Sequence, residues 1–156
     1  MKTLLLCPKD HGNTYTVFSY IQKQMAFSNA CDLKVLSPKS DYYLTKAELQ
    51  NYDRIIFGSG VYGGNLHKKL KEFLFSLKRE DVKCRCKLYL ALTWFGRSDS
   101  NMQVFNQAAE MLDEKGLYLQ NNFFSCFGAG FGLVRLGHPN AKELAASLTW
   151  FKELDS

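Results

Sequence analysis

Short apolar runs alternate with longer stretches of helical periodicity along the whole chain, and this alternation restricts the possible folds more than any other feature. The expected strands are 2–7, 32–36, 54–57, 87–92 and 117–126. The expected helices are 14–26, 45–52, 66–78, 100–115 and a last helix that starts after Pro139. The strands are apolar on both faces, as a sheet covered by helices on both sides requires. The pattern therefore predicts an α/β sandwich with a five-stranded parallel sheet.

Three local signals predict where individual helices begin and end. Thr45-Lys46-Ala47-Glu48 has the form of a capping box, which places the start of the second helix there. Gly116 should end the fourth helix, because glycine is the preferred residue just after a helix. Pro139 suits the first position of the last helix, where its missing N–H is not needed.

Length and composition favour one globular domain over residues 1–156, without linkers or repeats. No apolar run approaches the roughly 20 residues that a membrane helix needs, so we expect no integral membrane segment. The run that follows Met1-Lys2-Thr3 is too short for a signal peptide, which favours a cytoplasmic protein. The five cysteines are expected to be free thiols, since Cys84-x-Cys86 lacks the spacing of zinc or thioredoxin sites. No metal ligands and no catalytic residues stand out.

The chain is basic, with a formal net charge of +5. Lysines cluster at Lys68, Lys69 and Lys71, and further basic residues follow between 78 and 87. Such a surface suits nucleic acid or an acidic protein partner. The lysines, however, alternate with apolar residues at helical spacing, which favours the solvated face of an ordinary helix. We therefore expect no nucleic-acid partner.

The first predicted strand leads through a glycine turn directly into a helix. Residues 9–14 read Lys-Asp-His-Gly-Asn-Thr, and they lie between the apolar run 4–7 and a helical pattern that includes Val17 and Ile21. The free N–H groups of a first helical turn, together with the helix dipole, favour an anion at such a place. The turn therefore predicts a site for a phosphate group.

Three other loops combine glycines with an aromatic residue. They are 58–65, 93–98 and 127–132, and each follows a predicted strand. In open parallel sheets, ligands bind beyond the carboxyl ends of the strands, where the strand order reverses. Two aromatic side chains facing each other across such a cleft would form a slot for a flat ring system. Together with the phosphate turn, these loops predict a ligand that carries both a phosphate and a flat ring.

Gly12-Asn13-Thr14, the stretch 52–62 and Gly137-His138-Pro139-Asn140 resemble a flavodoxin-family protein, and the resemblance covers essentially the whole chain. It implies the strand order 2-1-3-4-5, with flavin mononucleotide (FMN) bound where the order reverses. The turn 9–14 would hold the phosphate of FMN, and the loops 58–65 and 93–98 would flank its isoalloxazine ring. Tyr62 and either Trp94 or Phe95 would be the pair that stacks on this ring.

The cofactor-binding residues implied by the resemblance are Lys9, Asp10, His11, Gly12, Asn13, Thr14, Ser59, Gly60, Val61, Tyr62, Gly63, Gly64, Asn65, Thr93, Trp94, Phe95, Gly96 and Arg97. The family's phosphate turn is usually rich in Ser and Thr, whereas this chain has Lys9 and His11 there. These two residues would replace hydroxyl donors with charge-assisted hydrogen bonds. Asp10 should point outward, because its charge would repel a phosphate.

The resemblance implies an electron-transfer protein that carries one electron at a time between redox partner proteins, a reductase and an acceptor. Because the chain is basic, acidic surfaces on these partners would be complementary to it. Two alternatives remain at this point. One is an FMN-dependent oxidoreductase of the same fold, of the quinone reductase or protoporphyrinogen oxidase type, which the stretch 52–56 also resembles. The other is a flavin-free module that binds a protein partner, and the altered turn is its only support.

Overall fold

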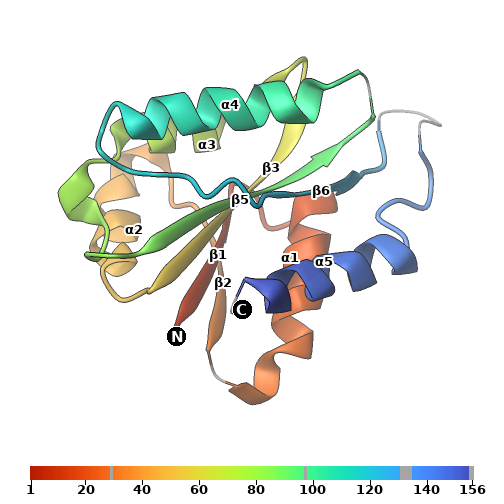
Figure 1. Cartoon of the computed structure of the whole chain (residues 1–156), viewed down its shortest axis with the longest axis horizontal. Coiled ribbons are helices and arrows are strands. Elements are labelled where there is room, and N and C mark those ends of the chain that lie inside the picture. The colour runs from red at the N-terminus through yellow and green to blue at the C-terminus, as the bar shows by residue number, and fades with distance from the viewer. Residues whose placement is uncertain (29, 97, 131–134, 155–156) are drawn as a thin grey trace.

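The chain folds into alternating strands and helices, seen in a computed structural model that describes residues 1–28, 30–96, 98–130 and 135–154 (Figure 1). The strands are β1 (Thr3–Cys7), β2 (Cys31–Val35), β3 (Arg54–Tyr62), β4 (Asn65–Leu66), β5 (Lys87–Trp94) and β6 (Phe124–Phe127). The helices are α1 (Asn13–Gln24), α2 (Tyr42–Leu49), α3 (Lys68–Ser76), α4 (Ser100–Asp113) and α5 (Ala141–Glu153). Short 3-10 helices occur at η1 (Ala26–Ser28), η2 (Lys39–Asp41) and η3 (Arg79–Asp81).

Five strands form a parallel sheet in the order β2-β1-β3-β5-β6, which confirms the predicted fold and strand order. The added strand β4 pairs antiparallel with the end of β3. Helices α1 and α5 cover one face of the sheet, and α2, α3 and α4 cover the other (Figure 1). The chain order reverses between β1 and β3, so ligand-binding loops are expected at the carboxyl ends of these two strands.

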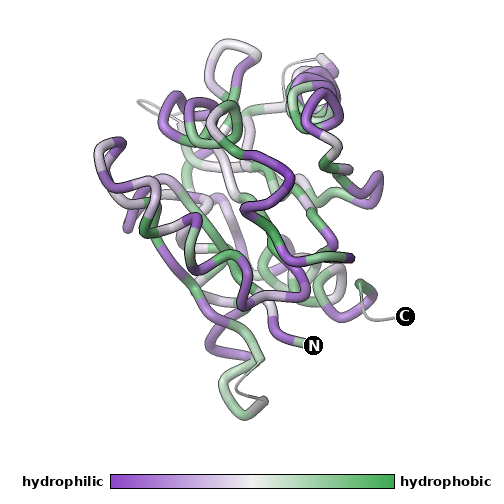
Figure 2. The backbone as a smooth tube through the Cα atoms, turned by 90° about the vertical axis from the view of Figure 1, so that its left-hand side faces the viewer, coloured by the Kyte–Doolittle hydropathy of each residue, from purple (hydrophilic) through white to green (hydrophobic). Residues whose placement is uncertain are grey.

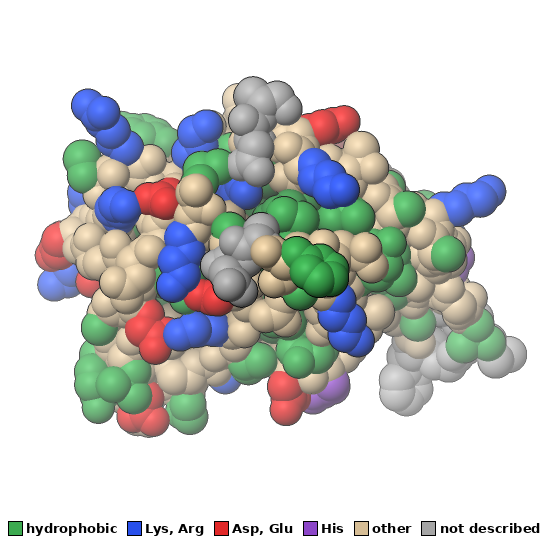
Figure 3. Space-filling model, turned by 90° about the horizontal axis from the view of Figure 1, so that it is seen from below, with side chains coloured by type: hydrophobic (Ala, Val, Ile, Leu, Met, Phe, Trp, Pro, Cys, Tyr) green, Lys and Arg blue, Asp and Glu red, His purple; other side chains and the backbone are tan. Residues whose placement is uncertain are grey.

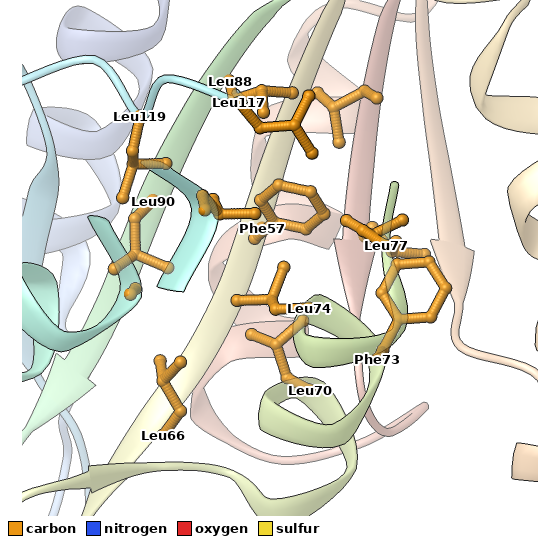
Figure 4. Packing of buried hydrophobic residues seen from close by; sticks show 14 of the residues in the cluster. Phe57, Leu66, Leu70, Phe73, Leu74, Leu77, Leu88, Leu90, Leu117 and Leu119 are labelled. Atoms are coloured by element: carbon orange, nitrogen blue, oxygen red, sulfur yellow. The ribbon is translucent and has the colours of Figure 1, made fainter. Parts of the chain in front are cut away.

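Alternate residues of each central strand serve the two faces, which explains why the strands are apolar throughout. Leu4 and Leu6 pack with α3 and α4 in the larger core, whereas Leu5 and Cys7 pack with α1 and α5 in the smaller one. Figure 4 shows side chains of α3 packing toward Phe57 of β3. The hydropathy of the chain follows this layering, with apolar strands in the interior and hydrophilic segments at the periphery (Figure 2).

The last strand is much shorter than the predicted 117–126. Residues 117–119 approach β5 through one isolated bridge between Leu119 and Leu88, and regular pairing begins only at Phe124. Between them the chain bends, since the N–H of Phe123 bonds to the carbonyl of Asn121 and the indole of Trp150 bonds to Asn122. The bend interrupts the ladder, and the alternating apolar residues before it therefore do not form the continuous strand that was predicted.

One predicted helix start and one predicted residue role were also wrong. Helix α2 begins at Tyr42, so Thr45 lies inside it and its hydroxyl contacts Ser37 Oγ at 2.9 Å instead of capping the helix. The last helix begins at Ala141, where the side chain of Asn140 accepts hydrogen bonds from the first turn. Pro139 therefore precedes the cap and does not occupy the first helical position.

The third strand is longer than predicted, because β3 continues through the glycine-containing loop to Tyr62. Pairing with β5 extends to Gly60, and pairing with β4 takes over at Val61 and Tyr62. Residues 58–60 of the predicted loop are thus part of the sheet, and Val61 to Leu66 form a hairpin.

The charged residues of the surface are mixed in sign where Figure 3 displays them. On the face seen from below Figure 1, lysine and arginine side chains are interspersed with acidic ones and with apolar groups. Among the residues that the structure describes, no helix has the length and apolar character needed to cross a membrane.

Candidate functional site

A cleft of about 390 Å³ lies where β1, β3 and β5 end, bounded by the predicted phosphate turn and three loops. Ten of the predicted site residues line it: Lys9, His11, Gly12, Asn13, Thr14, Gly60, Val61, Tyr62, Thr93 and Phe95. An adjoining hollow is lined by Gly63 and Gly64 of the hairpin together with Phe95. The fold therefore brings together segments that lie as far apart in the sequence as Cys7 and Gly130.

Five of the predicted residues lie away from the lining of this cleft. Ser59 is buried, and its hydroxyl accepts a hydrogen bond from the N–H of His67 at 2.8 Å. Asp10 points outward as expected and pairs with His11 at 2.8 Å. Asn65 begins β4, Trp94 ends β5 and Gly96 lies in the loop after it. Arg97 lies outside the described residues, as do residues 131–132 of the third loop.

The phosphate turn has the backbone geometry that an anion site needs. Gly12 adopts φ 89°, a conformation that favours glycine, and it caps α1 without any side-chain hydrogen bond. The first N–H groups of α1 have no partner within the helix and lie at the positive end of its dipole. Lys9 and His11 line the cleft beside them. The turn thus presents main-chain donors and two basic side chains to the cleft.

The two polar side chains that start α1 are engaged within the protein. Asn13 Nδ2 donates to the carbonyl of Ala129 at 2.8 Å, and Asn13 Oδ1 accepts from the N–H of Ala129 at 3.2 Å. The hydroxyl of Thr14 bonds to that of Thr93 at 3.0 Å in a buried position. Asn13 therefore ties the loop after β6 to α1, and Thr14 ties α1 to β5.

The hairpin between β3 and β4 presents Tyr62 at the opposite wall of the cleft. Gly63 and Gly64 form its tip with φ of 55° and 76°, as a tight two-residue turn requires. The ring of Tyr62 is about half exposed and meets the imidazole of His67 edge-on at 5.6 Å. The Lys9 Nζ lies 5.8 Å from the centre of the same ring. A basic group of the phosphate turn thus faces the aromatic wall across the cleft.

The sequence left Trp94 and Phe95 as alternatives for the second aromatic wall, and the structure places Phe95 in the cleft with Tyr62. Trp94 instead stacks on Phe127 at 6.0 Å between ring centres. Arg135 supports this arrangement from a distant part of the chain. Its Nε donates to the carbonyl of Phe95 at 2.8 Å, and its guanidinium lies 3.7 Å from the centre of the Phe127 ring.

His67 connects the aromatic wall to α3. Its Nδ1 accepts a hydrogen bond from the N–H of Lys69 at 3.2 Å and so caps the helix, a role that needs a neutral imidazole. Burial lowers the pKa of His67 below its usual value, and the nearby charges of Lys9 and Lys69 lower it further. The cap is therefore favoured at neutral pH.

The cysteines near the site are poor nucleophiles. All five are free thiols, as the sequence indicated. Burial raises the pKa of Cys7, which lines the cleft, to about 11 and that of Cys126 to about 12. Because the thiolate is the reactive form, neither side chain is suited to covalent chemistry at neutral pH.

Several residues of the site were not predicted. Cys7, Pro8, Tyr15, Ala129 and Gly130 also line the cleft. The glycine-rich stretch that contains Ala129 and Gly130 was noted as a ligand-type loop, so a signal for these two existed. The support that Arg135 gives to the Phe95 loop bridges 40 positions, and no local pattern in the sequence indicates it.

The comparisons with known proteins agree with this geometry. A family model of the flavodoxin domain matches residues 7–132, well over half of the chain. The fold is similar to that of flavodoxin 2 from Bacillus cereus, with a TM-score of 0.70, 19% sequence identity and coverage of 99% of each chain. It is also similar to the Trp repressor binding protein from Bacillus subtilis, with a TM-score of 0.67, 14% identity and coverage of 96% and 97%.

A third similar structure is an NADPH-quinone reductase from P. pentosaceus, with a TM-score of 0.68, 12% identity and coverage of 100% of this chain and 98% of that one. Identities this low establish a shared fold and no more. No curated protein matches the sequence.

Proposed function

Because the chain belongs to the flavodoxin domain family, we propose that it binds FMN in the cleft beyond β1, β3 and β5 and carries electrons between redox partner proteins. One observation carries the proposal. A helix start with basic neighbours and a pair of aromatic residues line the same cleft, which suits a ligand with a phosphate at one end and a flat ring at the other. When bound, FMN supplies the electron chemistry.

The phosphate is held by main-chain N–H groups at the start of α1 together with Lys9 and His11. The side chains of Asn13 and Thr14 already bond to Ala129 and Thr93, so they position the turn and do not compete for the phosphate. A charge-assisted hydrogen bond contributes about 1.5–3 kcal/mol, roughly twice a neutral one. Lys9 therefore compensates for the hydroxyl donors that are usual in the family.

The ring occupies the slot between Tyr62 and Phe95. The main chain at Gly60 and Val61 lies at the cleft wall and provides polar partners for the ring edge, and Thr93 lines the same wall with its hydroxyl bonded to that of Thr14. The hairpin tip at Gly63 and Gly64 borders the adjoining hollow and helps to exclude water from the ring. These residues bind and orient the cofactor, and the same slot keeps its local dielectric low.

Equilibrium dialysis of the purified protein against FMN and against riboflavin tests the proposal. We expect micromolar or tighter retention of FMN and weaker retention of riboflavin, which lacks the phosphate. Lys9→Ala should weaken FMN binding by about 10- to 100-fold, because about 1.4 kcal/mol corresponds to a factor of ten. Lys152→Ala, an exposed lysine near the C-terminal end of α5, is the matched control. Failure to retain FMN at micromolar concentrations would overturn the proposal.

A second experiment separates a carrier from an enzyme. The fold is similar to that of the NADPH-quinone reductase named above, so direct turnover is the alternative to test. The FMN-loaded protein should pass electrons between an added reductase and an acceptor, and should not by itself oxidise NADPH with a quinone. Sustained NADPH oxidation without a reductase would favour the oxidoreductase alternative. Fractionation of cells should place the protein in the cytoplasm.

A further inference from the structure

A second hollow lies on the outer face of α3, away from the cofactor cleft. Its volume is about 450 Å³, and it is bounded by η2, α3 and α4. The residues that matter for its chemistry are Lys39, Lys68, Lys71, Glu72, Phe75 and Met111. We call this surface the α3 groove. Nothing in the proposed binding of FMN uses it.

The α3 groove contains an aromatic side chain that the fold leaves uncovered. Phe75 is 70% exposed, whereas Phe73 on the same helix is fully buried against Tyr42. The Lys115 Nζ lies 4.8 Å from the centre of the Phe75 ring, so a cation already sits beside it. Aromatic residues are enriched at protein–protein interfaces relative to the rest of the surface.

The charge of the groove is predominantly positive. Three lysines and one glutamate line it, and Glu72 pairs with Lys39 at 3.8 Å. Within the described part of the chain, Lys68 and Lys71 form no ion pair; Lys71 donates to the side-chain oxygen of Asn65 at 3.2 Å. Two positive charges without an ion-pair partner therefore lie beside an apolar surface, while Glu110 and Glu114 line the adjoining hollow on the α4 side. This combination complements a segment that carries both carboxylates and apolar side chains.

The groove is connected to the hairpin that forms one wall of the cofactor cleft. Asn65, which Lys71 contacts, belongs to β4 and pairs with Tyr62. Gln107 of α4 donates to the carbonyl of Gly64 at the hairpin tip at 3.3 Å. Phe75 lies seven residues beyond Lys68, or about 10 Å along the helix axis. A molecule seated in the groove would therefore also lie close to the hairpin.

We infer that the α3 groove docks an acidic segment of a redox partner protein, with carboxylates on Lys68 and Lys71 and an apolar side chain against Phe75 and Met111. The inference rests on the proposed function, since it assigns the partner to the same electron transfer. A protein segment fits better than a nucleic acid, because Glu72 and the apolar floor would oppose a phosphate backbone. Docking there would bring the partner next to the wall formed by Tyr62.

The test measures binding of a fluorescein-labelled peptide of 12 residues, made of Glu and Asp with two central Leu, to the FMN-loaded protein by fluorescence anisotropy. Lys68→Glu/Lys71→Glu should weaken binding by at least about tenfold, as expected for loss of two close charge pairs. Phe75→Ala should also weaken binding. Lys142→Glu/Lys152→Glu on α5 carries the same charge change and should bind like the wild type. A peptide with Gln in place of Glu and Asp should not bind.

FMN retention by each variant is measured in parallel and should be unchanged, which separates this inference from the proposed function. Absence of peptide binding to a protein that retains FMN would overturn the docking inference and leave the proposed function intact. Equal weakening in the α5 control would overturn it as well, because binding would then follow net charge alone. Two other results would also overturn the docking inference. One is a sedimentation experiment in which the wild type self-associates and Phe75→Ala does not. The other is displacement of the peptide by a 12-nucleotide single-stranded DNA.

Discussion

The contact between Asn13 and Gly128 provides a sharp test of how the cofactor cleft is built. The side chain of Asn13 forms two hydrogen bonds with the main chain of Ala129. A Cβ at position 128 would lie 2.8 Å from Asn13 Cγ and closer still to Nδ2. Gly128 is thus required by space, because the loop after β6 approaches α1 too closely for a side chain.

Asn13→Ala removes both hydrogen bonds, and at about 1 kcal/mol each the free energy of unfolding should fall by about 2 kcal/mol. Gly128→Ala should cost about as much, since the new methyl group displaces the Asn13 side chain and the same two bonds are lost. In the double variant the Cγ and Nδ2 atoms are gone, and the nearest remaining contact is Asn13 Cβ at 3.1 Å. The double variant should therefore cost about 2 kcal/mol, not 4, which gives a coupling energy of about 2 kcal/mol.

Urea unfolding of the four proteins measures these values, with the slope of the transition unchanged. Asn101→Ala is a matched control, because its side-chain amide donates to Ser125 Oγ at 3.1 Å, and a Cβ at position 128 would meet Asn13 and not Asn101. Asn101→Ala should lower the free energy of unfolding by about 1 kcal/mol or less. In the double variant with Gly128→Ala, the two losses should simply add. If the costs of Asn13→Ala and Gly128→Ala simply add, the two residues do not share one contact, and the reasoning is refuted.

Three further predictions concern stability. Phe73→Ala should lower the free energy of unfolding by about 3–5 kcal/mol in chemical denaturation, because this side chain is fully buried. Phe75→Ala should change it by less than about 0.5 kcal/mol, because this side chain is exposed. Similar losses in the two variants would contradict the packing of α3. The pKa of His67 is lower in the folded state, so the stability that depends on neutral His67 is complete above the ordinary pKa of 6.5 and declines as pH falls below it. His67→Asn still caps α3 and should reduce this decline in thermal melts between pH 7 and 5. An unchanged dependence of stability on pH would contradict the prediction. Gly58→Ala places a methyl group about 2.5 Å from the Phe18 ring and should cost about 1–3 kcal/mol in urea, so a neutral result would show that α1 can move away from β3.

Much of the fold was predictable because its signals are local. Apolar runs such as 4–7 are buried on both faces only in a covered parallel sheet, and helix-period segments between them leave little choice of fold class. The errors occurred where a local signal was overridden by a contact elsewhere. The capping-box pattern predicted a helix start at Thr45, but the helix begins three residues earlier. The strand predicted at 117–126 is interrupted by a bend that a hydrogen bond from Trp150 stabilises.

The candidate site was predictable only as a set of loops. The turn 9–14 and the glycine-aromatic loops follow from residue types that act locally, namely a helix start and positive φ at glycine. The sequence did not decide between Trp94 and Phe95, and it did not indicate that the side chains of Asn13 and Thr14 bond to Ala129 and Thr93. These outcomes depend on which partner a side chain meets across the sheet.

The amino-acid sequence by itself thus determined the order of elements, the two-sided apolar sheet and a phosphate-type turn, because each follows from periodicity and backbone preference within a few residues. Only the tertiary structure decided that Phe95 faces the cleft with Tyr62, that Arg135 supports that loop and that Phe75 stays exposed while Phe73 is buried. Side chains far apart in the chain compete for the same space and the same hydrogen-bond partners, and that competition is resolved only when the layers pack.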